Sequence, residues 1–541
     1  MPRGLLLAAL AIGALLRVYP LHVPFIHPDQ ESIPLQALGM VAARTWRPPD
    51  LVYPSGFLYL LRTSYAAMGA GSDPLDVVLA YLRDPFPFLL VARVLACAFG
   101  IATIAAVAAL GRELGDRWTG ALAALVLATN ILHVRESHYG TGDVPAAALV
   151  TAALVAAVAY VRTPRPGTLV VAGLAAGFAA GFRYPAAMAL AGVATAAIVA
   201  PGVTLRTRAL ALGAAGTAAL AIFFVATPYT LLDLERARAR LANQLFWSRA
   251  AFLAPPGLPL RTLLPAVLGW LPLAAAVLGV AVLVATRLRA AAPLLVTTAL
   301  VLGVLSQPHR IFARYTLAVV PALCALAAVG LRATLALVPA RARPAAAVVL
   351  VGAVLFEPAA RSVTLVRLLA ITDTRVAAGA WLRDNVPDAT AVWIPNSPTG
   401  YAIPVLPLTL GAIAWRLDRS LVPGLVARQR TAGPPAPAGR VAPYDASARS
   451  LEALGREGGF VVTSDHPVLD RWARTPPEVQ DLLAARGTVV ARFAGIDPAA
   501  AEQTLFEPID ANFVPLRGAC TLDAPGPTIT IWRLPPATGR G

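Results

Sequence analysis

Residues 118–161 read WTGALAALVLATNILHVRESHYGTGDVPAAALVTAALVAAVAYV. Two apolar runs, 118–134 and 144–161, flank a polar segment at 135–143. At about 1.5 Å of rise per residue, each run is close to the length that a helix needs to cross a hydrocarbon core about 30 Å thick. The pattern predicts two membrane helices joined by a short polar turn.

Apolar runs of the same kind recur along the chain. The expected spans are 4–20, 86–110, 118–134, 144–161, 168–183, 186–201, 209–227, 262–286, 291–306, 315–332 and 344–360. The 541 residues are 57% hydrophobic and only 14% charged, whereas a soluble protein of this length needs more charges to cover its surface. The composition therefore predicts an all-α polytopic membrane domain with about eleven transmembrane helices.

The formal net charge is +16, and all 45 basic residues are arginine. A basic chain that binds nucleic acid presents a basic stripe with interleaved aromatic side chains on a soluble domain. Here the arginines lie mostly between the apolar runs, so we expect no nucleic-acid partner. The three cysteines do not make a disulfide framework.

The arginines fall on every second short connection between the expected spans. They are Arg112 and Arg117, Arg162 and Arg165, Arg206 and Arg208, Arg287 and Arg289, and Arg332, Arg341 and Arg343. Short basic connections stay in the cytoplasm, which predicts a multi-pass protein of the plasma (inner) membrane with a cytoplasmic N-terminus. Everything after residue 361 then lies outside the cytoplasm, as do the connections 21–85, 135–143, 228–261 and 307–314.

The first outer connection, 21–85, is unusually long. Within it, 33–44 and 56–68 read as helices that are too short or too polar to span the bilayer alone. We expect both to lie along the membrane surface as amphipathic helices.

The composition changes after residue 360, so we predict a membrane domain at 1–360 and a small extracytoplasmic α/β domain at 361–541. Helical stretches alternate there with strand-like stretches, namely helices at 374–384 and 447–457 and strands at 391–394, 460–463, 489–493 and 529–532. The segment 421–445 is rich in Pro, Gly and Ala and reads as an irregular loop.

Two carboxylates, Asp29 and Glu31, follow the first span in a chain that has few acidic residues. A carboxylate at a membrane interface can act as a general base, or it can hold a metal together with His27. The structural alternative is a helix start in which Asp29 is the cap and Glu31 lies on the first turn. No motif requires a cofactor, and a divalent cation at these carboxylates is the alternative kept open.

The polar segment 135–143 supplies further candidates, of which Asp143 is the strongest and Glu136 and His138 are the weaker ones. Asp143 is followed by a proline two positions later, a pattern that is typical of a helix cap with proline in the first turn. Capping and binding are compatible, because the second oxygen of a capping carboxylate can still face a site.

A third group contains Arg310, Arg314 and Tyr315. The two arginines are four residues apart, which predicts one face of the helix that begins the tenth span. Two guanidinium groups at a membrane interface suit bidentate binding of phosphate, while snorkelling to lipid headgroups is the structural alternative. Arg93 and Arg183 are weaker candidates, since an arginine with apolar neighbours near a span end usually faces protein or water.

The order of these motifs resembles the GT-C type glycosyltransferases that use lipid-linked sugars, in the branch of protein O-mannosyltransferases and the aminoarabinose transferase of lipid A. The matching motifs are His27-Pro-Asp-Gln-Glu31, Tyr53-Pro-Ser-Gly-Phe57, Ala92-Arg93-Val94, Gly111-Arg-Glu-Leu-Gly115, Ser137 to Asp143-Val-Pro145, Phe312-Ala-Arg-Tyr-Thr-Leu317 with Pro321, and Asp373-Thr-Arg with Ala380-Trp-Leu.

The resemblance implies a GT-C fold and transfer of a sugar from a polyprenyl-phosphate donor to a protein, lipid or glycan acceptor outside the cytoplasm, among membrane lipids. It also implies that the first-loop acid activates the acceptor hydroxyl and that the anomeric carbon is inverted. Relatives commonly carry an adjacent Asp-Glu pair, and Gln30 separates the two acids here, so whether Asp29 or Glu31 acts stays open.

A multispan transporter or lipid flippase is the main alternative function, and a catalytically inactive binding or scaffold protein is another. A transporter predicts broken helices, charges near the bilayer midplane and often an internal repeat. We find no convincing repeat, and the predicted topology gathers the polar candidates on one face of the membrane. This favours the glycosyltransferase.

Overall fold

The computed structural model describes residues 2–249, 258–307, 311–387, 390–396, 402 and 440–537. Arg310 and most of the expected loop 421–445 lie outside the described residues. The backbone of 28–32 is described as helix, but the side chains of Asp29 and Glu31 also lie outside the described residues.

The protein is a mostly helical, multi-pass membrane protein. Five helical stretches are long and apolar enough to span a bilayer, namely α5 (Phe86–Leu114), α8 (Asp143–Arg162), α11 (Leu205–Ala226), α15 (Trp270–Leu305) and the stretch Arg343–Asn385, which contains α17 (Arg343–Leu369) and α18 (Thr374–Asn385). Shorter apolar helices are α1 (Pro2–Val18), α6 (Arg117–Ala128), α9 (Pro166–Ala180), α10 (Ala189–Val199) and α16 (Val320–Ala336). The expected total of about eleven spans stays a prediction.

Backbone contacts divide the chain into two units, each of which is described by itself. The membrane unit comprises Met1–Leu21, Trp46–Ser64 and Leu90–Val366. The C-terminal unit comprises His22–Thr45, Tyr65–Leu89 and Arg367–Gly541. It therefore includes α2 (Pro28–Ala42) and α4 (Pro74–Arg83) from the long first connection. A domain boundary at residues 360 and 361 stays a prediction.

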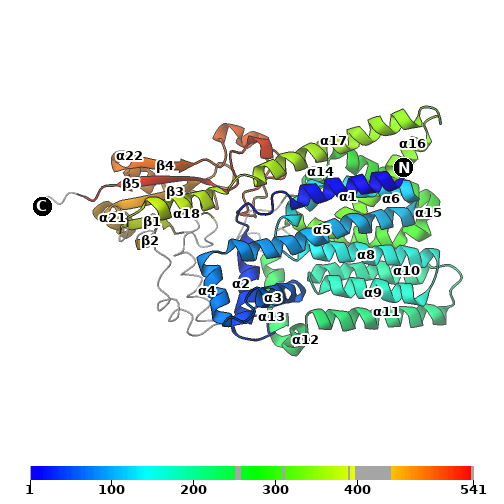
Figure 1. The fold of residues 1–541 in the computed structure, drawn as a ribbon. Coiled ribbons are helices and arrows are strands. Elements are labelled where there is room, and N and C mark those ends of the chain that lie inside the picture. The colour runs from blue at the N-terminus through cyan, green and yellow to red at the C-terminus, as the bar shows by residue number, and fades with distance from the viewer. Residues whose placement is uncertain are drawn as a thin grey trace. The chain divides into compact units, whose positions relative to one another are not determined.

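Close helix packing organises the membrane unit, in which the long helices run side by side (Figure 1). A Cβ atom on Gly330 of α16 would collide with the carbonyl oxygen of Ala275, and one on Gly279 of α15 would collide with that of Leu326. Glycine at both positions therefore lets the two backbones touch, which is how helices gain van der Waals contact in a membrane.

The two expected spans at 262–286 and 291–306 correspond largely to α15. Its backbone leaves the helical region at Arg287, where φ is −144° and ψ is 33°. α15 thus consists of two helical segments that meet at Arg287, which is the position of the expected turn at 287–290. The short helix α14 (Leu260–Leu268) precedes it and ends at Gly269, which has a φ of +88°.

A five-stranded sheet with the strand order β2-β1-β3-β5-β4 forms the core of the C-terminal unit and confirms the small α/β domain. The strands are β1 (Ala391–Pro395), β2 (Arg440–Tyr444), β3 (Gly459–Asp465), β4 (Thr488–Phe493) and β5 (Thr528–Leu534). β1 pairs in parallel with β2 and β3, while β5 is antiparallel to β3 and β4. The strand β2 corrects the sequence interpretation, since it occupies the end of the expected loop 421–445.

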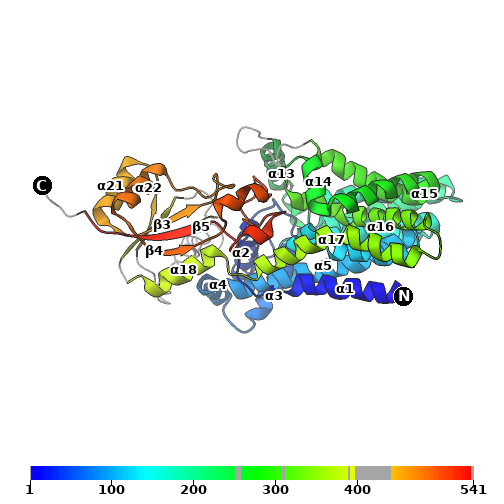
Figure 2. The same ribbon diagram turned by 90° about the horizontal axis from the view of Figure 1, so that it is seen from above.

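Helices cover both faces of this sheet, because alternate strand residues point to opposite sides. Phe460 and Val462 pack toward Leu382 of α18. Val461, between them, packs toward Leu454 of α21 (Ala448–Glu457) and Leu483 of α22 (Pro477–Arg486). Figure 2 shows α18 on one side of the strands and α21 and α22 on the other.

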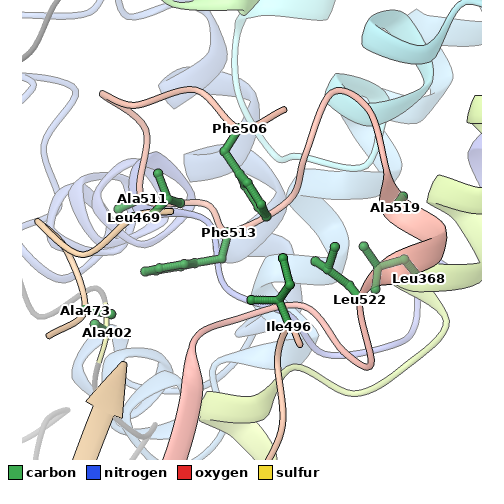
Figure 3. Packing of buried hydrophobic residues seen from close by; sticks show 10 residues of the cluster. All are labelled: Leu368, Ala402, Leu469, Ala473, Ile496, Phe506, Ala511, Phe513, Ala519 and Leu522. Carbon is green, nitrogen blue, oxygen red and sulfur yellow. The ribbon is translucent and has the colours of Figure 1, made fainter. Parts of the chain in front are cut away.

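A second buried cluster lies among the loops of the C-terminal unit (Figure 3). Its members include Leu469, Phe506 and Phe513. The imidazole of His466 packs edge-on against Phe506, with 4.8 Å between ring centroids. Its Nδ1 accepts hydrogen bonds from the backbone N–H groups of Val468, at 3.1 Å, and Leu469, at 2.9 Å. These two bonds require an unprotonated Nδ1, so the folded state holds a neutral imidazole.

We predict that His466 makes the C-terminal unit sensitive to acid. Burial lowers the pKa of the His466 imidazole from 6.5 to about 4. Between these values the unfolded chain binds a proton that the folded chain does not, so stability falls as the pH falls from 6.5 to 4, by about 3 kcal/mol in all. In thermal unfolding of the detergent-solubilised protein, the stability of the His466→Asn variant should depend less on pH than that of the unmodified protein. An equal dependence of stability on pH in both proteins would contradict the prediction.

Candidate functional site

Asp143 is the first residue of α8 and is 95% buried, with only 5% of its surface exposed. The helix cap is Gly142, so the expectation that Asp143 caps the helix is wrong. Its Oδ2 instead accepts a hydrogen bond from the Thr141 hydroxyl at 3.0 Å and one from Nη2 of Arg183. The carboxylate is thus held by a hydroxyl from its own loop and by a guanidinium from another helix end.

Arg183 follows the end of α9 and precedes the 3-10 helix η1 (Tyr184–Met188). Its backbone is extended, with φ −148° and ψ 119°. The guanidinium carbon lies 4.5 Å from the ring centroid of Tyr53, a cation–π distance. Arg183 therefore joins the loop that carries Tyr53 to the start of α8 through Asp143.

Arg314 lies in the 3-10 helix η2 (Ala313–Ala318) and is 7% exposed. Its guanidinium carbon is 4.1 Å from the ring centroid of Phe312 and 6.0 Å from that of Tyr315. The element η2 packs against α8, which begins at Asp143, and the charge of Arg314 interacts electrostatically with that of Arg183. Asp143, Arg183 and Arg314 therefore form one polar group. We call this group, with the neighbouring residues Tyr53, Thr141, Phe312 and Tyr315, the Asp143 cluster.

The expected helix with Arg310 and Arg314 on one face is not present in the part of the chain that the structure describes. The backbone at Ile311 and Phe312 is not helical, and η2 begins only at Ala313. A 3-10 helix has three residues per turn, so spacings of four do not align its side chains. Of the two arginines, the structure brings Arg314 into the Asp143 cluster.

Glu136 and His138 are both engaged in contacts that fix α7 (Ile131–Ser137). Glu136 Oε1 accepts two hydrogen bonds from Arg135, at 2.9 and 2.7 Å, and both side chains are 1% exposed. The ring nitrogens of His138 lie 2.8 Å from the Val134 carbonyl oxygen and 3.1 Å from that of Tyr19. The contact of His138 with Tyr19 attaches the polar segment to the end of the first helix.

Arg93 and Arg17 bind backbone carbonyl groups inside the membrane unit. Arg93 donates to the Leu21 carbonyl oxygen at 3.3 Å. Arg17 donates to the carbonyl oxygens of Leu127 and Ala128, each at 3.0 Å, and so satisfies the end of α6. The sequence interpretation missed the role of Arg17, although an arginine within an apolar run was the available signal. Its Nη2 also lies 3.0 Å from Nδ1 of His133.

The chain before Asp29 is anchored within the C-terminal unit by a buried ion pair. Arg375 Nη2 lies 2.6 Å from Oδ2 of Asp373, and their side chains are 1% and 0% exposed. Asp373 Oδ2 accepts from the N–H of Ile26 at 3.3 Å, and Arg375 Nη2 donates to the Ile26 carbonyl at 3.0 Å. The backbone is thus fixed three residues before Asp29, which lies with Glu31 in the first turn of α2.

We predict that Asp373→Asn lowers the free energy of unfolding by about 3 kcal/mol, because it leaves the Arg375 cation buried without its carboxylate. The matched control is Asp384→Asn, which removes an exposed carboxylate 3.8 Å from Nε of Arg383 and should cost close to nothing. Denaturant unfolding of the purified protein measures both. Equal stability of Asp373→Asn and the control would show that the buried pair does not hold the segment.

A metal site was the alternative for the first-loop carboxylates. Among the residues whose side chains the structure describes, no group of three or more His, Cys, Asp or Glu side chains is placed to hold a metal ion. The side chains of Asp29 and Glu31 are outside this statement.

Comparisons with known proteins support the expected resemblance. Residues 89–229 match the family model described as dolichyl-phosphate-mannose-protein mannosyltransferase. This region contains most of α5, all of α8 and the residues Asp143 and Arg183. No curated protein matches the sequence.

Among solved structures, ArnT from Cupriavidus metallidurans bound to undecaprenyl phosphate is 14% identical and aligns over 99% of this chain and 98% of its own, with a TM-score of 0.50. Archaeal oligosaccharyltransferase AglB from Archaeoglobus fulgidus, in complex with an inhibitory peptide and a dolichol-phosphate, is 13% identical over 90% of this chain and 72% of its own, with a TM-score of 0.48. The S. cerevisiae protein O-mannosyltransferase Pmt1-Pmt2 complex is 16% identical over 44% and 34%, with a TM-score of 0.34. The match to ArnT carries the fold assignment, and the resemblance to GT-C glycosyltransferases is confirmed.

Proposed function

From its resemblance to the GT-C glycosyltransferases, we propose that this protein is a membrane glycosyltransferase that moves a sugar from a polyprenyl-phosphate donor to an acceptor on the extracytoplasmic side of the plasma (inner) membrane. The N-terminus is then cytoplasmic and the C-terminal domain extracytoplasmic. The acceptor is a protein, a lipid or a glycan. The family match over residues 89–229 and the likeness to ArnT, which was solved with undecaprenyl phosphate, support this function.

The observation that carries the proposal is the Asp143 cluster of the membrane unit, in which the Asp143 carboxylate and Arg314 are buried and Arg183 is partly buried. Charged side chains inside a membrane protein are costly and mark substrate pathways or binding sites. Asp143 neutralises and orients Arg183, while Arg314 is stacked on Phe312 at 4.1 Å. Guanidinium groups held in fixed planes bind phosphate oxygens through paired hydrogen bonds.

In the proposed reaction the acceptor hydroxyl oxygen attacks the anomeric carbon of the donor sugar, and the bond from that carbon to the phosphate oxygen breaks. One displacement of this kind inverts the anomeric carbon. The polyprenyl phosphate departs with additional negative charge, which Arg314, Arg183 and Arg310 stabilise, with Tyr315 beside them. Asp29 or Glu31 takes the proton from the acceptor hydroxyl.

The remaining candidate residues keep other parts of the site in position. His138 holds the polar segment that carries Asp143 through the Tyr19 carbonyl, and Glu136 neutralises the buried Arg135 of the same segment. Arg93 binds the Leu21 carbonyl, where the first acidic connection begins. We assign these three residues to keeping the substrate-binding segments in place.

Replacing Arg314 by glutamine should lower sugar transfer about a hundredfold to a thousandfold, the usual loss when a group that stabilises transition-state charge is removed. Arg261→Gln is the control, because Arg261 is exposed in the same unit and should leave transfer unchanged. The assay measures the transfer of labelled sugar from polyprenyl-phosphate donors to membrane acceptors. Normal transfer by Arg314→Gln would remove this residue from the mechanism.

The base is tested with Asp29→Asn and Glu31→Gln, which keep side-chain size and remove the charge. One of the two should lose about a hundredfold to ten-thousandfold in transfer, and the other should keep most of its activity. Donor binding should persist in both, because the phosphate is bound elsewhere. If both variants transfer sugar at the normal rate, neither carboxylate is the base.

Reconstituted vesicles separate the enzyme from a transporter or flippase. The enzyme forms a new glycosidic bond and releases polyprenyl phosphate in equal amount. A transporter would move the labelled donor across the vesicle membrane with the donor intact, and that result would replace the proposed function.

A further inference from the structure

A cavity of about 330 Å³ lies between three helices of the membrane unit, away from the Asp143 cluster. The start of α1, the end of α5 and the start of α6 line it, and Figure 1 shows the starts of α1 and α6 at the same end of the helix bundle. Its volume is at the lower end of the range for small-molecule sites, about 300–1,000 Å³. It has room for one compact polar group.

Three arginines line this cavity: Arg3, Arg112 and Arg117. They come from three different helices, and each is exposed rather than packed into the protein. Three guanidinium groups suit an anion that offers several oxygen atoms, such as a phosphodiester.

The nearby acidic residues also pair with arginines outside the cavity. Glu113 bridges two arginines, since its Oε2 lies 3.0 Å from Nη1 of Arg162 and its Oε1 lies 3.7 Å from Nη2 of Arg112. Asp116 accepts from the backbone and hydroxyl of Thr119 at the start of α6 and pairs with Arg332 at 2.8 Å. The cavity therefore keeps a concentration of positive charge, although two carboxylates lie close to it in the sequence.

The walls of the cavity are apolar. They include Leu6 from α1 and Ala105 and Ala109 from α5, while Gly120 lets α6 approach α5 closely, because a Cβ there would collide with the Ala108 carbonyl oxygen. Small side chains on membrane helices leave a groove between the helices, and here that groove adjoins the three arginines. A ligand with a phosphate and adjoining hydrocarbon matches both parts.

The position along α5 places this cavity far from the proposed reaction. Arg112 follows Arg93 by nineteen positions on the same helix, which is about 28 Å at 1.5 Å per residue. That distance is close to the thickness of a hydrocarbon core, so the two arginines lie near opposite faces of the bilayer. The end of α5 that carries Arg112 is the one that the arginine pattern assigns to the cytoplasm.

We propose that this cavity is a binding site for the headgroup of an anionic phospholipid of the cytoplasmic leaflet, with the phosphodiester among Arg3, Arg112 and Arg117 and the first part of an acyl chain along Leu6 and Ala105. Basic pockets between membrane helices on the cytoplasmic side bind anionic lipid headgroups. This site does not depend on the proposed glycosyltransferase function, and its test needs no donor or acceptor.

The test is native mass spectrometry of the full-length protein in a mild detergent, titrated with phosphatidylglycerol. The protein should bind one phosphatidylglycerol tightly and saturably, while zwitterionic phosphatidylcholine binds weakly. Arg112→Gln combined with Arg117→Gln should bind phosphatidylglycerol about thirtyfold more weakly. The control combines Arg206→Gln with Arg289→Gln, two exposed arginines of other basic connections, and should bind like the unmodified protein.

A second variant, Ala105→Trp, obstructs the groove and keeps all three arginines, and it should also weaken binding. Equal binding by the Arg112 and Arg117 variant and the unmodified protein would overturn the site. Equal weakening by the control would show that surface charge alone attracts the lipid. Competition by inorganic phosphate at matched concentration would overturn the lipid assignment in favour of a soluble anion.

Discussion

A charge that is removed from water must be compensated by a partner, and this constraint determines how the protein uses its arginines. An isolated buried charge costs several kcal/mol, so the chain can bury a guanidinium group only where oxygen atoms surround it. Arg17, Arg135 and Arg375 are all at most 1% exposed, and each binds backbone carbonyl or carboxylate oxygens. The bonds from Arg17 to the Ala128 carbonyl and from Arg375 to the Ile26 carbonyl also join segments that are far apart in the sequence.

The type of partner separates structural from functional arginines. Arg17 and Arg93 donate to carbonyl groups at helix ends and hold the bundle together. Arg375 pairs with Asp373 and holds the backbone of Ile26. Arg183 differs, because it pairs with Asp143 and also interacts electrostatically with the like charge of Arg314. Two like charges in one apolar region are costly, and a bound phosphate would stabilise both.

Local patterns predicted the regular elements well. The expected helix at 56–68 is α3 (Gly56–Met68), and each of the four expected strands lies within an observed strand. Hydrophobic periodicity depends on neighbours in the sequence, so it is visible without the fold. The strand β2 was missed because a segment rich in Pro and Gly shows no alternation. The 3-10 form of η2 was missed because its sequence is compatible with an α-helix.

The candidate site was predicted only in part, because its contacts are long-range. Asp143, Arg183 and Arg314 were each identified as unusual residues, and the structure brings these three together. Nothing in the sequence pairs Asp143 with Arg183, which is forty residues away. The hydrogen bond from Ile26 to Asp373 spans 347 residues, and periodicity cannot reveal it. Residue type can therefore identify a costly charge, but only the fold identifies its partner.

The central claim is that the Asp143 cluster binds the phosphate of a lipid-linked sugar. The most direct measurement compares the equilibrium binding of undecaprenyl phosphate with that of undecaprenol, which has the same chain and no phosphate, to the purified full-length protein. We expect the phosphate to bind at least tenfold more tightly, and the Arg314→Gln variant to lose most of that difference. Equal affinity for the two lipids, or a preference that survives in Arg314→Gln, would contradict the claim.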